Sequence, residues 1–417
     1  MMIKIICSAQ AYTYNAYHIV KAFYPAVEIT NHVEEKASNY VEINFSDGQV
    51  IAVEKEEIKA ETDAEKKAQI DKKLYEKLSE KSGKTLAWGI LTGVRPTKLA
   101  MKKLEEGMES EAFVSWFRQT YLVSEEKARL AWEIAGREKK LLDRLDYEDG
   151  YSLYVGIPFC PTVCTYCSFS SGALEDWKDF VDAYVEALCK ELAFIGEVSK
   201  EKKLNSIYIG GGTPTSLNAR QLERILSCID THFSREYLLE YTVEAGRPDS
   251  ITEEKLQVIK AHKVTRISIN PQTMQQKTLD VIGRKHTVED ICRTYEMARS
   301  LGFDNINMDL IAGLPGETAL DMKDTLEKIG RLQPDSLTVH SLAIKRAAKM
   351  GQEVKAGQEE GRESTLSPEI GEMIREAEKA ADDMGLKPYY LYRQKNIAGN
   401  FENVGYAKVD KAGIYNI

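Results

Sequence analysis

After Gly150 the chain alternates between short β-rich runs and longer amphipathic runs. The β-rich runs are apolar and lie at residues 151–157, 204–211, 239–245, 264–270, 304–313 and 335–343. Stretches of helical periodicity separate them, at residues 176–200, 218–233, 252–262, 288–302 and 319–332. This alternation predicts βαβ units on one parallel sheet, joined by right-handed connections. The pattern does not by itself distinguish an open, doubly wound sheet from a barrel.

Unusual residues stand at the ends of five of these predicted strands. A cysteine-rich loop follows the first strand, the run Gly210 to Pro214 follows the second, and Glu244 ends the third. Asn270 to Gln272 follow the fourth strand, and Asp309 lies in the fifth. In parallel α/β folds, the loops after the strands converge on one mouth where ligands bind. These features therefore predict one site at the carboxyl edge of the sheet.

The loop after the first strand holds three cysteines, Cys160, Cys164 and Cys167, with the spacing C-x3-C-x2-C. A structural zinc site needs four protein ligands, and no further Cys or His lies within twenty residues on either side. A redox pair of Cys164 and Cys167 would leave Cys160 without a role. A [4Fe–4S] cluster held by three thiolates leaves one iron open to a substrate or cofactor. The spacing favours the cluster, with zinc as the alternative.

Composition narrows the class of protein further. The 417 residues carry a formal net charge of -9, and 43% of them are apolar, which is typical of a globular protein with two or three domains. The acidic balance argues against nucleic-acid binding, and no long apolar window or signal peptide indicates membrane insertion. We therefore expect a cytoplasmic protein. The remaining cysteines show no spacing pattern and are interpreted as small buried hydrophobes: Cys7, Cys189, Cys228 and Cys292.

Residues 1–146 precede the alternating region and end at a polar break, Asp146 to Gly150. Residues 1 to about 60 resemble strand material, with a hairpin turn at Asp47 and Gly48. From Asp63 onward the periodicity is helical. The segment therefore predicts an α+β domain, to which the sequence assigns no function.

The cysteine motif, with Tyr166 directly before the last cysteine, resembles the signature of radical S-adenosylmethionine (SAM) enzymes. The flanking sequence is similar to the oxygen-independent coproporphyrinogen III oxidases, also called coproporphyrinogen dehydrogenases, over residues 151–393. The segments that match are LYVGIPFCPTVCTYCSF, YIGGGTPTSL, TVEAGRPDSI, RISINPQT, IGRKHT, MDLIAGLPGET and PDSLTVHSLA. The best match is a divergent branch with a long N-terminal extension. The resemblance implies a partial (β/α)6 barrel after the smaller N-terminal domain.

The resemblance also implies the cofactors and the residues that bind them. Cys160, Cys164 and Cys167 would hold a [4Fe–4S] cluster, and SAM would chelate its open iron and yield a 5'-deoxyadenosyl radical on reduction. The residues expected to bind one or two SAM molecules are Tyr154, Gly211, Gly212, Thr213, Glu244, Gln272, Arg284, Asp309 and Ala343. In the glycine run, the lack of a Cβ would let backbone amides approach SAM.

The implied reaction converts propionates of coproporphyrinogen III to vinyl groups in haem synthesis, with electrons from a donor such as flavodoxin or ferredoxin. Cations expected to meet the propionates of this tetrapyrrole are Arg266, Lys345, Arg346 and Arg393. The chain departs from the family at Gly156, where a histidine is typical, and at Ser168 and Phe169, where a further cysteine is absent. Residues 394–417 resemble the start of a longer C-terminal region. A haem chaperone of the same family, or an enzyme of another tetrapyrrole, therefore stays an alternative.

Overall fold

The computed structural model describes residues 2–25, 27–91, 93, 95–169, 171–345, 347–353, 369–393 and 401–417. The chain forms two compact units. The first comprises Met1–Gly136 and Leu391–Asn403, and the second comprises Arg137–Tyr390 and Val404–Ile417. The division of the chain into 1–146, 151–393 and 394–417 stays a prediction; the observed units divide about ten residues earlier, within a helix.

The first unit begins with a four-stranded sheet in the order β2-β1-β3-β4, of which β1 and β2 are parallel and the other pairs antiparallel. Its strands are β1 (Met2–Cys7), β2 (Glu28–Val33), β3 (Asn39–Phe45) and β4 (Val50–Glu54). The predicted hairpin at Asp47 and Gly48 is confirmed: it joins β3 to β4, and Gly48 has a φ of 86°. Such a left-handed conformation favours glycine.

Helix α1 (Gln10–Phe23) corrects the prediction of strand material up to residue 60. Its buried residues Ala16, Ile19, Val20 and Phe23 have the i, i+3, i+4, i+7 spacing of a helical face. They pack with the alternate residues of β1 into one apolar core, to which α2 also contributes. The aromatic and β-branched residues of α1 are typical of strands, which explains the wrong prediction. The helical spacing of its buried residues decides the structure.

The predicted helical region of the first unit is confirmed. Its helices are α2 (Asp63–Ser82), α3 (Thr97–Glu105), α4 (Ser110–Tyr121) and α5 (Glu125–Leu142). The carboxylate of Glu402, near the C-terminal end of the chain, contacts this helical region. Trp88 Nε1 donates to Glu402 Oε2 at 2.7 Å, and Lys127 Nζ lies 2.8 Å from Glu402 Oε1. The side chain of Glu402 is completely buried, and both of these contacts lie within the first unit.

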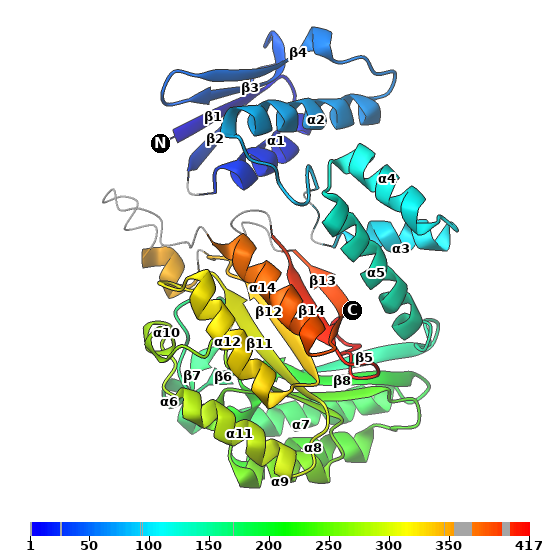
Figure 1. Ribbon diagram of the computed structural model, residues 1–417. Coiled ribbons are helices and arrows are strands. Elements are labelled where there is room, and N and C mark those ends of the chain that lie inside the picture. The colour runs from blue at the N-terminus through cyan, green and yellow to red at the C-terminus, as the bar shows by residue number, and fades with distance from the viewer. Residues whose placement is uncertain are drawn as a thin grey trace. The chain divides into compact units, whose positions relative to one another are not determined.

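The second unit contains an eight-stranded sheet in the order β13-β14-β12-β11-β10-β9-β8-β5 (Figure 1). Its parallel strands are β5 (Gly150–Ile157), β8 (Lys203–Gly211), β9 (Glu240–Gly246), β10 (Arg266–Ile269), β11 (Ile306–Ala312) and β12 (Ser336–Ser341). The sheet curls into a half barrel, which confirms the expected partial (β/α)6 fold. Strands β13 (Lys387–Tyr392) and β14 (Asn403–Ala407) extend it, and β14 is antiparallel to β12.

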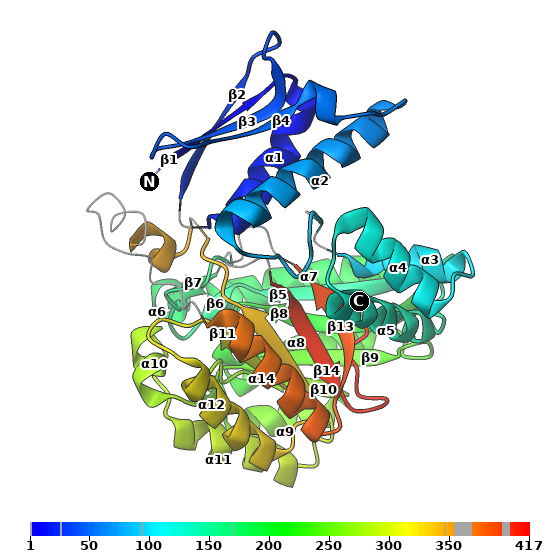
Figure 2. The ribbon, with the colours of Figure 1, turned by 45° about the horizontal axis from the view of Figure 1, so that its top comes forward.

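Helices cover the outer face of the half barrel (Figure 2). The helices described after β5 are α6 (Leu174–Trp177), α7 (Val181–Val198), α8 (Ala219–His232), α9 (Glu253–Ala261), α10 (Gln276–Val281), α11 (Val288–Ser300), α12 (Ala319–Leu332) and α14 (Ile370–Asp383). Four of them begin at a polar side chain that accepts a hydrogen bond from the first-turn backbone, namely Asn218, Thr252, Thr287 and Thr318. Such caps satisfy amides that have no partner inside the helix.

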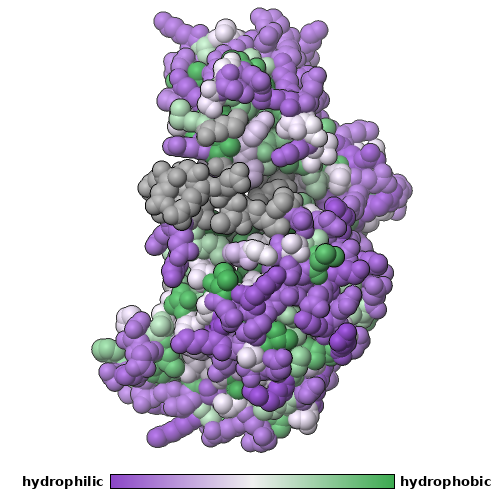
Figure 3. Space-filling model, turned by 60° about the vertical axis from the view of Figure 1, so that its left-hand side comes forward, coloured by the Kyte–Doolittle hydropathy of each residue, from purple (hydrophilic) through white to green (hydrophobic). Residues whose placement is uncertain are grey.

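No helix in the described part of the chain has both the length and the apolar composition needed to cross a lipid bilayer. Figure 3 shows a face on which hydrophilic residues predominate and hydrophobic residues form small, scattered groups.

Candidate functional site

The cysteine loop is anchored at the carboxyl ends of β5 and β8. Two backbone amides of the glycine run, residues 210–214, hold the start of this loop. Gly212 N–H donates to the oxygen of Ile157 at the end of β5, and Thr213 N–H donates to Phe159 O, both at 2.7 Å. Within the loop, β6 (Phe159–Cys160) pairs in parallel with β7 (Gly172–Ala173). The predicted convergence of the cysteine loop and the glycine run is therefore present. However, these two amides are engaged within the protein, so the glycine run holds the loop and does not offer the amides to SAM.

The need for glycine at position 212 is steric. A Cβ on Gly212 would lie 2.6 Å from Phe159 O and 2.9 Å from Ile157 O. Atoms at this distance overlap, so a side chain would push the cysteine loop away from β8.

We expect Gly212→Ala to weaken this anchor, at a cost of about 1 to 2 kcal/mol of stability, which is a typical overpacking penalty. The measurement is urea unfolding of the cluster-free protein, together with iron content after anaerobic reconstitution. Gly330→Ala is the matched control, because nothing lies within 4 Å of a Cβ at that helical position. Equal iron content in the Gly212→Ala and wild-type proteins would contradict the expectation.

The three cysteines are free thiols; Cys164 is buried, whereas Cys160 and Cys167 are partly exposed. Thr213 Oγ1 donates to Cys160 Sγ at 3.5 Å, and Cys167 N–H donates to Cys164 O at 3.1 Å. Among the described residues, no group of three or more Cys, His, Asp or Glu side chains gathers around a single ion position. A [4Fe–4S] cluster needs three thiolates that each bind a different iron, and the loop supplies three thiols.

Arg247 ties the cysteine loop to the end of β9, and the sequence reasoning missed it. Its Nη1 donates to Thr162 O at 2.7 Å and to Thr162 Oγ1 at 2.8 Å, and it lies 3.9 Å from Cys164 Sγ. The other side of the guanidinium forms a bidentate pair with Asp249, at 2.9 and 2.6 Å. His286 Nδ1 lies 3.5 Å from the same carboxylate. Arg247 is only 3% exposed, so a buried positive charge stands beside a predicted cluster thiolate.

Arg284, which the resemblance predicted as a SAM-binding residue, is a second cation at the cysteine loop. Its Nη1 donates to Asn270 O at 2.5 Å and its Nη2 donates to Tyr166 OH at 3.2 Å. The nearby residue Gln272 adopts a left-handed φ of 68°. Its backbone N–H donates to the backbone oxygen of Asp309 at 2.9 Å. Three buried polar atoms, Arg284 Nε, Asn270 Oδ1 and Gln272 Oε1, have no hydrogen-bond partner among the described residues. Buried groups of this kind normally have partners, so the site fits a polar ligand.

Glu244 lies on the inner face of the half barrel and accepts a hydrogen bond from Tyr208 OH. Burial raises the pKa of Glu244 to about 7; the Tyr208 bond opposes the rise, and the carboxylate of Asp309 adds to it. Gly210 makes room for this carboxylate, because a Cβ there would lie 2.8 Å from Glu244 Oε2. A carboxyl group that titrates near neutral pH is a frequent feature of functional sites.

Three tyrosine rings lie nearly parallel beside this carboxylate. Tyr208 stacks on Tyr415 with ring centroids 4.6 Å apart, and the Tyr154 ring lies about 6 Å from both. Tyr154 is 49% exposed, so its face is open to a ligand. The predicted residue Tyr154 is therefore placed beside Glu244, and sequence reasoning missed Tyr208 and Tyr415.

Asp309 is placed on the same inner face. Asn307 Nδ2 donates to its Oδ1 at 2.6 Å, and His340 Nε2 lies 3.9 Å from its Oδ2. Ala343 is partly exposed and follows β12 at the carboxyl edge.

Of the cations proposed for the propionates, Arg266, Lys345 and Arg393 lie among the described residues. Arg266 is buried in the half barrel and donates to Ser336 Oγ at 3.3 Å. Arg393 belongs to the first unit, where its Nη1 donates to Leu91 O at 2.8 Å. Lys345 follows β12, and Arg346 lies outside the described residues. A role of these cations toward the propionates stays a prediction.

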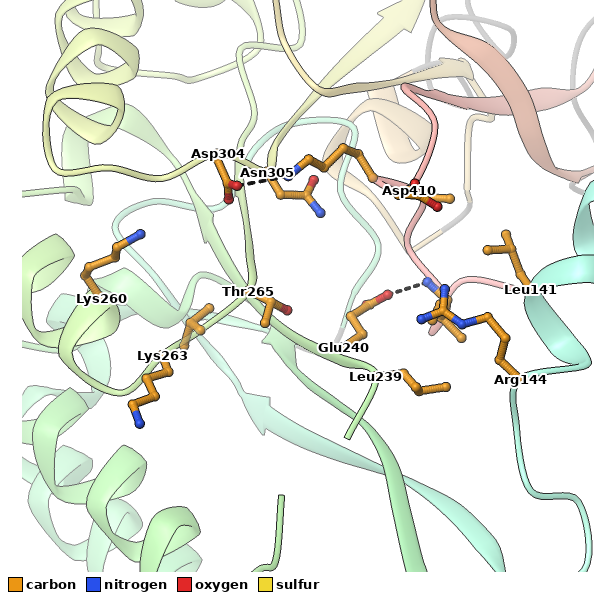
Figure 4. A pocket seen from close by; sticks show the side chains of 14 residues that line it. Leu141, Arg144, Leu239, Glu240, Lys260, Lys263, Thr265, Asp304, Asn305 and Asp410 are labelled. Carbon is orange, nitrogen blue, oxygen red and sulfur yellow. Dashed lines mark hydrogen bonds and ion pairs between the residues drawn. The ribbon is translucent and has the colours of Figure 1, made fainter. Parts of the chain in front are cut away.

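A separate cavity of about 450 Å³ lies at the opposite, amino-terminal edge of β9 to β11 (Figure 4). Its charged lining is largely paired within the protein: Lys411 forms an ion pair with Asp304 at 3.0 Å, and Glu240 accepts the amide of Ile414. The cavity is distant in the fold from the cysteine loop and contributes no residue to that site.

Comparisons with known proteins agree with this geometry. A family model described as the radical SAM superfamily matches residues 154–329. The oxygen-independent coproporphyrinogen-III oxidase-like protein HemZ of Bacillus subtilis is 44% identical over 344 residues, which is 82% of this chain and 68% of the relative. The haem chaperone HemW of Bacillus subtilis is 36% identical over 46% of this chain and 50% of its own length.

Among solved structures, coproporphyrinogen III oxidase (HemN) from Escherichia coli, a radical SAM enzyme, matches with a TM-score of 0.52 and 25% identity. The match covers 65% of this chain and 58% of that structure. Membership of the superfamily implies a [4Fe–4S] cluster and SAM, and supports an enzyme with a haem-related role. On the cysteine motif, the half barrel and these relatives, the chain belongs to the radical SAM superfamily, among the oxygen-independent coproporphyrinogen III oxidase-like proteins.

Proposed function

We propose that this protein carries out the oxidative decarboxylation of coproporphyrinogen III propionates to vinyl groups. The observation that supports this proposal most is the joint placement of the cysteine loop, Arg284 and Glu244 on one edge of the half barrel, in a chain 44% identical to an oxidase-like relative. The tetrapyrrole substrate and the electron donor, such as flavodoxin or ferredoxin, belong to the same proposal.

Cys160, Cys164 and Cys167 would hold the cluster, with Arg247 and Arg284 as cations beside the thiolates. When bound and reduced, the cluster with SAM supplies hydrogen-atom abstraction from carbon. The residues of this chain would position SAM and keep water away from the reacting carbon. Arg284 Nε and Gln272 Oε1 have unused hydrogen-bonding capacity, and we assign them to the polar methionine end of SAM.

Glu244 and Asp309 are assigned to ribose hydroxyls, because a carboxylate accepts several hydrogen bonds. The half-exposed ring of Tyr154 would contact a base or ribose face, and Ala343 would contribute backbone atoms. Because these residues lie both near the cysteine loop and farther along the inner face, we propose that two SAM molecules bind side by side.

A haem chaperone is the second candidate. The chain has Gly156 where the oxidases have a histidine, and a haem chaperone is among its relatives at 36% identity. In that case the inner face would hold haem without turning over a substrate.

The two functions are separated by incubating anaerobically reconstituted protein with SAM, a reductant and coproporphyrinogen III. We expect 5'-deoxyadenosine together with products that have lost one or two carboxyl groups, both measured by mass spectrometry. Cys164→Ala is the control, because it removes one thiolate of the motif and should abolish both products. Formation of 5'-deoxyadenosine without decarboxylation would contradict the oxidase, and tight haem binding without turnover would favour the chaperone.

A further inference from the structure

Two cysteines outside the site, Cys189 on α7 and Cys228 on α8, lie against each other. Cys228 Sγ contacts Cys189 O at 3.4 Å, and Cys189 Sγ contacts Arg224 O, one helical turn before Cys228, at 3.9 Å. Each sulfur therefore reaches the backbone of the opposite helix at the level of the other cysteine. The sequence suggested buried, inert thiols at both positions, but the structure leaves both partly exposed.

The two helices run parallel, in a register that brings these cysteines to the same level. About two turns toward the amino-terminal ends of both helices, Gln221 Nε2 donates a hydrogen bond to Asp182 Oδ1 at 2.7 Å. Above them the helices come so close that a Cβ on Gly196 would lie 2.7 Å from His232 O. The contacts below and above the cysteines fix the register of the two helices, so the meeting of the thiols is a consequence of the helix packing.

The remaining unassigned cysteines lack such a neighbour. Cys7 is completely buried in the first unit, and burial raises its pKa to about 11. Cys292 lies on α11, and no described cysteine contacts it. Burial, with a smaller effect of the adjacent Cys189 thiol, raises the pKa of Cys228 to about 11. Both thiols are partly exposed and lie within reach of a small oxidant.

We propose that Cys189 and Cys228 are a modification site at which a peroxide forms an intramolecular disulfide. The Cys189 sulfur attacks the O–O bond of hydrogen peroxide, becomes a sulfenic acid and releases the first water. The Cys228 sulfur then displaces the hydroxyl group as the second water, and the S–S bond forms. Two thiols and one peroxide give one disulfide and two waters, so atoms and electrons balance. This inference depends only on the helix packing and is independent of the proposed function.

The disulfide would close a segment that includes the glycine run. Residues 189 and 228 are 39 positions apart, and the segment between them contains β8 and residues 210–214. Tyr184, near the start of α7, donates to Gly156 O at 2.6 Å, which connects α7 to the strand before the cysteine loop. The cross-link would therefore restrain the two βα units that carry the cysteine loop and its anchor, and should raise the unfolding temperature.

Tryptic mapping of the folded, full-length protein tests the inference. Each cysteine falls in its own peptide, 179–190 for Cys189 and 225–235 for Cys228, whereas the three loop cysteines share residues 145–178. After brief treatment with hydrogen peroxide and alkylation, we expect a linked 179–190/225–235 species that has lost two hydrogens. Dithiothreitol should return both peptides to the alkylated form.

Cys189→Ser and Cys228→Ser should each abolish the linked species and the rise in unfolding temperature, while Cys292→Ser should leave both unchanged. The wild-type peptide map decides the question even if a variant fails to fold. Recovery of Cys228 as a reduced thiol while Cys189 becomes a sulfinic acid would overturn the inference. A cross-link of either residue to the loop peptide 145–178 would overturn it as well.

Discussion

Replacing Arg247 with methionine is expected to remove most of the iron that the protein retains after reconstitution. Methionine keeps the apolar stem but loses the donors to Thr162 O, Thr162 Oγ1 and Cys164 Sγ. The cysteine loop then loses its link to β9, and a neighbouring positive charge no longer stabilises the thiolate. The measurement is iron and sulfide per chain after anaerobic reconstitution, supported by absorbance and electron paramagnetic resonance.

The same variant should destabilise the cluster-free protein by about 3 kcal/mol, the lower end for breaking a buried pair. Asp249 would lose its bidentate partner, although its side chain keeps 18% exposure, which moderates the cost. Burial opposes ionisation of Asp249, but the nearby His286 ring and the hydrogen-bonded Arg247 guanidinium keep the pKa of Asp249 well below its usual range. Urea unfolding of the apo protein measures this loss.

A second variant separates the two effects of Arg247. In Arg247→Met/Asp249→Leu, the unpaired carboxylate is gone, so stability should recover while iron retention stays low. Arg293→Met is the surface control, because its side chain is 76% exposed and its ion pair with Asp290 contributes little. Full iron content in Arg247→Met would show that the guanidinium does not position the loop.

The residues whose position in the fold the sequence predicted are those that local spacing alone locates. The cysteine motif, the glycine run and Glu244 each stand next to an apolar strand, and parallel topology brings strand ends together without further information. The six parallel strands of the half barrel were predictable for the same reason.

The residues that were missed depend on contacts between distant segments. Arg247 lies in a segment that was noted, but its role appears only when β9 is placed beside Thr162 and Cys164. Cys189 and Cys228 carry no spacing signal, because the register of two packed helices decides whether they meet. Tyr415 reaches Tyr208 through the return of the chain after β14, which no local pattern encodes.

Ionisation of the buried Glu244 carboxyl is expected to make the stability of the folded protein depend on pH. In the unfolded chain this carboxyl ionises near its ordinary pKa of 4.5, whereas in the folded protein burial raises the pKa to about 7. Between these values the folded state holds more protons than the unfolded state, so stability falls as the pH rises and levels off above about 7. At 1.36 kcal/mol per pKa unit, the contribution of Glu244 to this fall is roughly 3 kcal/mol.

Glu244→Gln should therefore remove roughly 3 kcal/mol of the pH dependence, so that the variant gains stability relative to wild type as the pH is raised from 4.5 to 7.5. Urea unfolding of the apo protein at several pH values measures the difference. Glu186→Gln is the control, because its ion pair with Lys190 is solvent-exposed and should change little. If the carboxylate also accepts ribose hydroxyls, SAM affinity should rise through about pH 7 in wild type and stay flat in Glu244→Gln. Parallel pH profiles of wild-type and Glu244→Gln stability would contradict the buried titration, whereas a flat SAM profile in wild type alone would contradict only the ribose assignment.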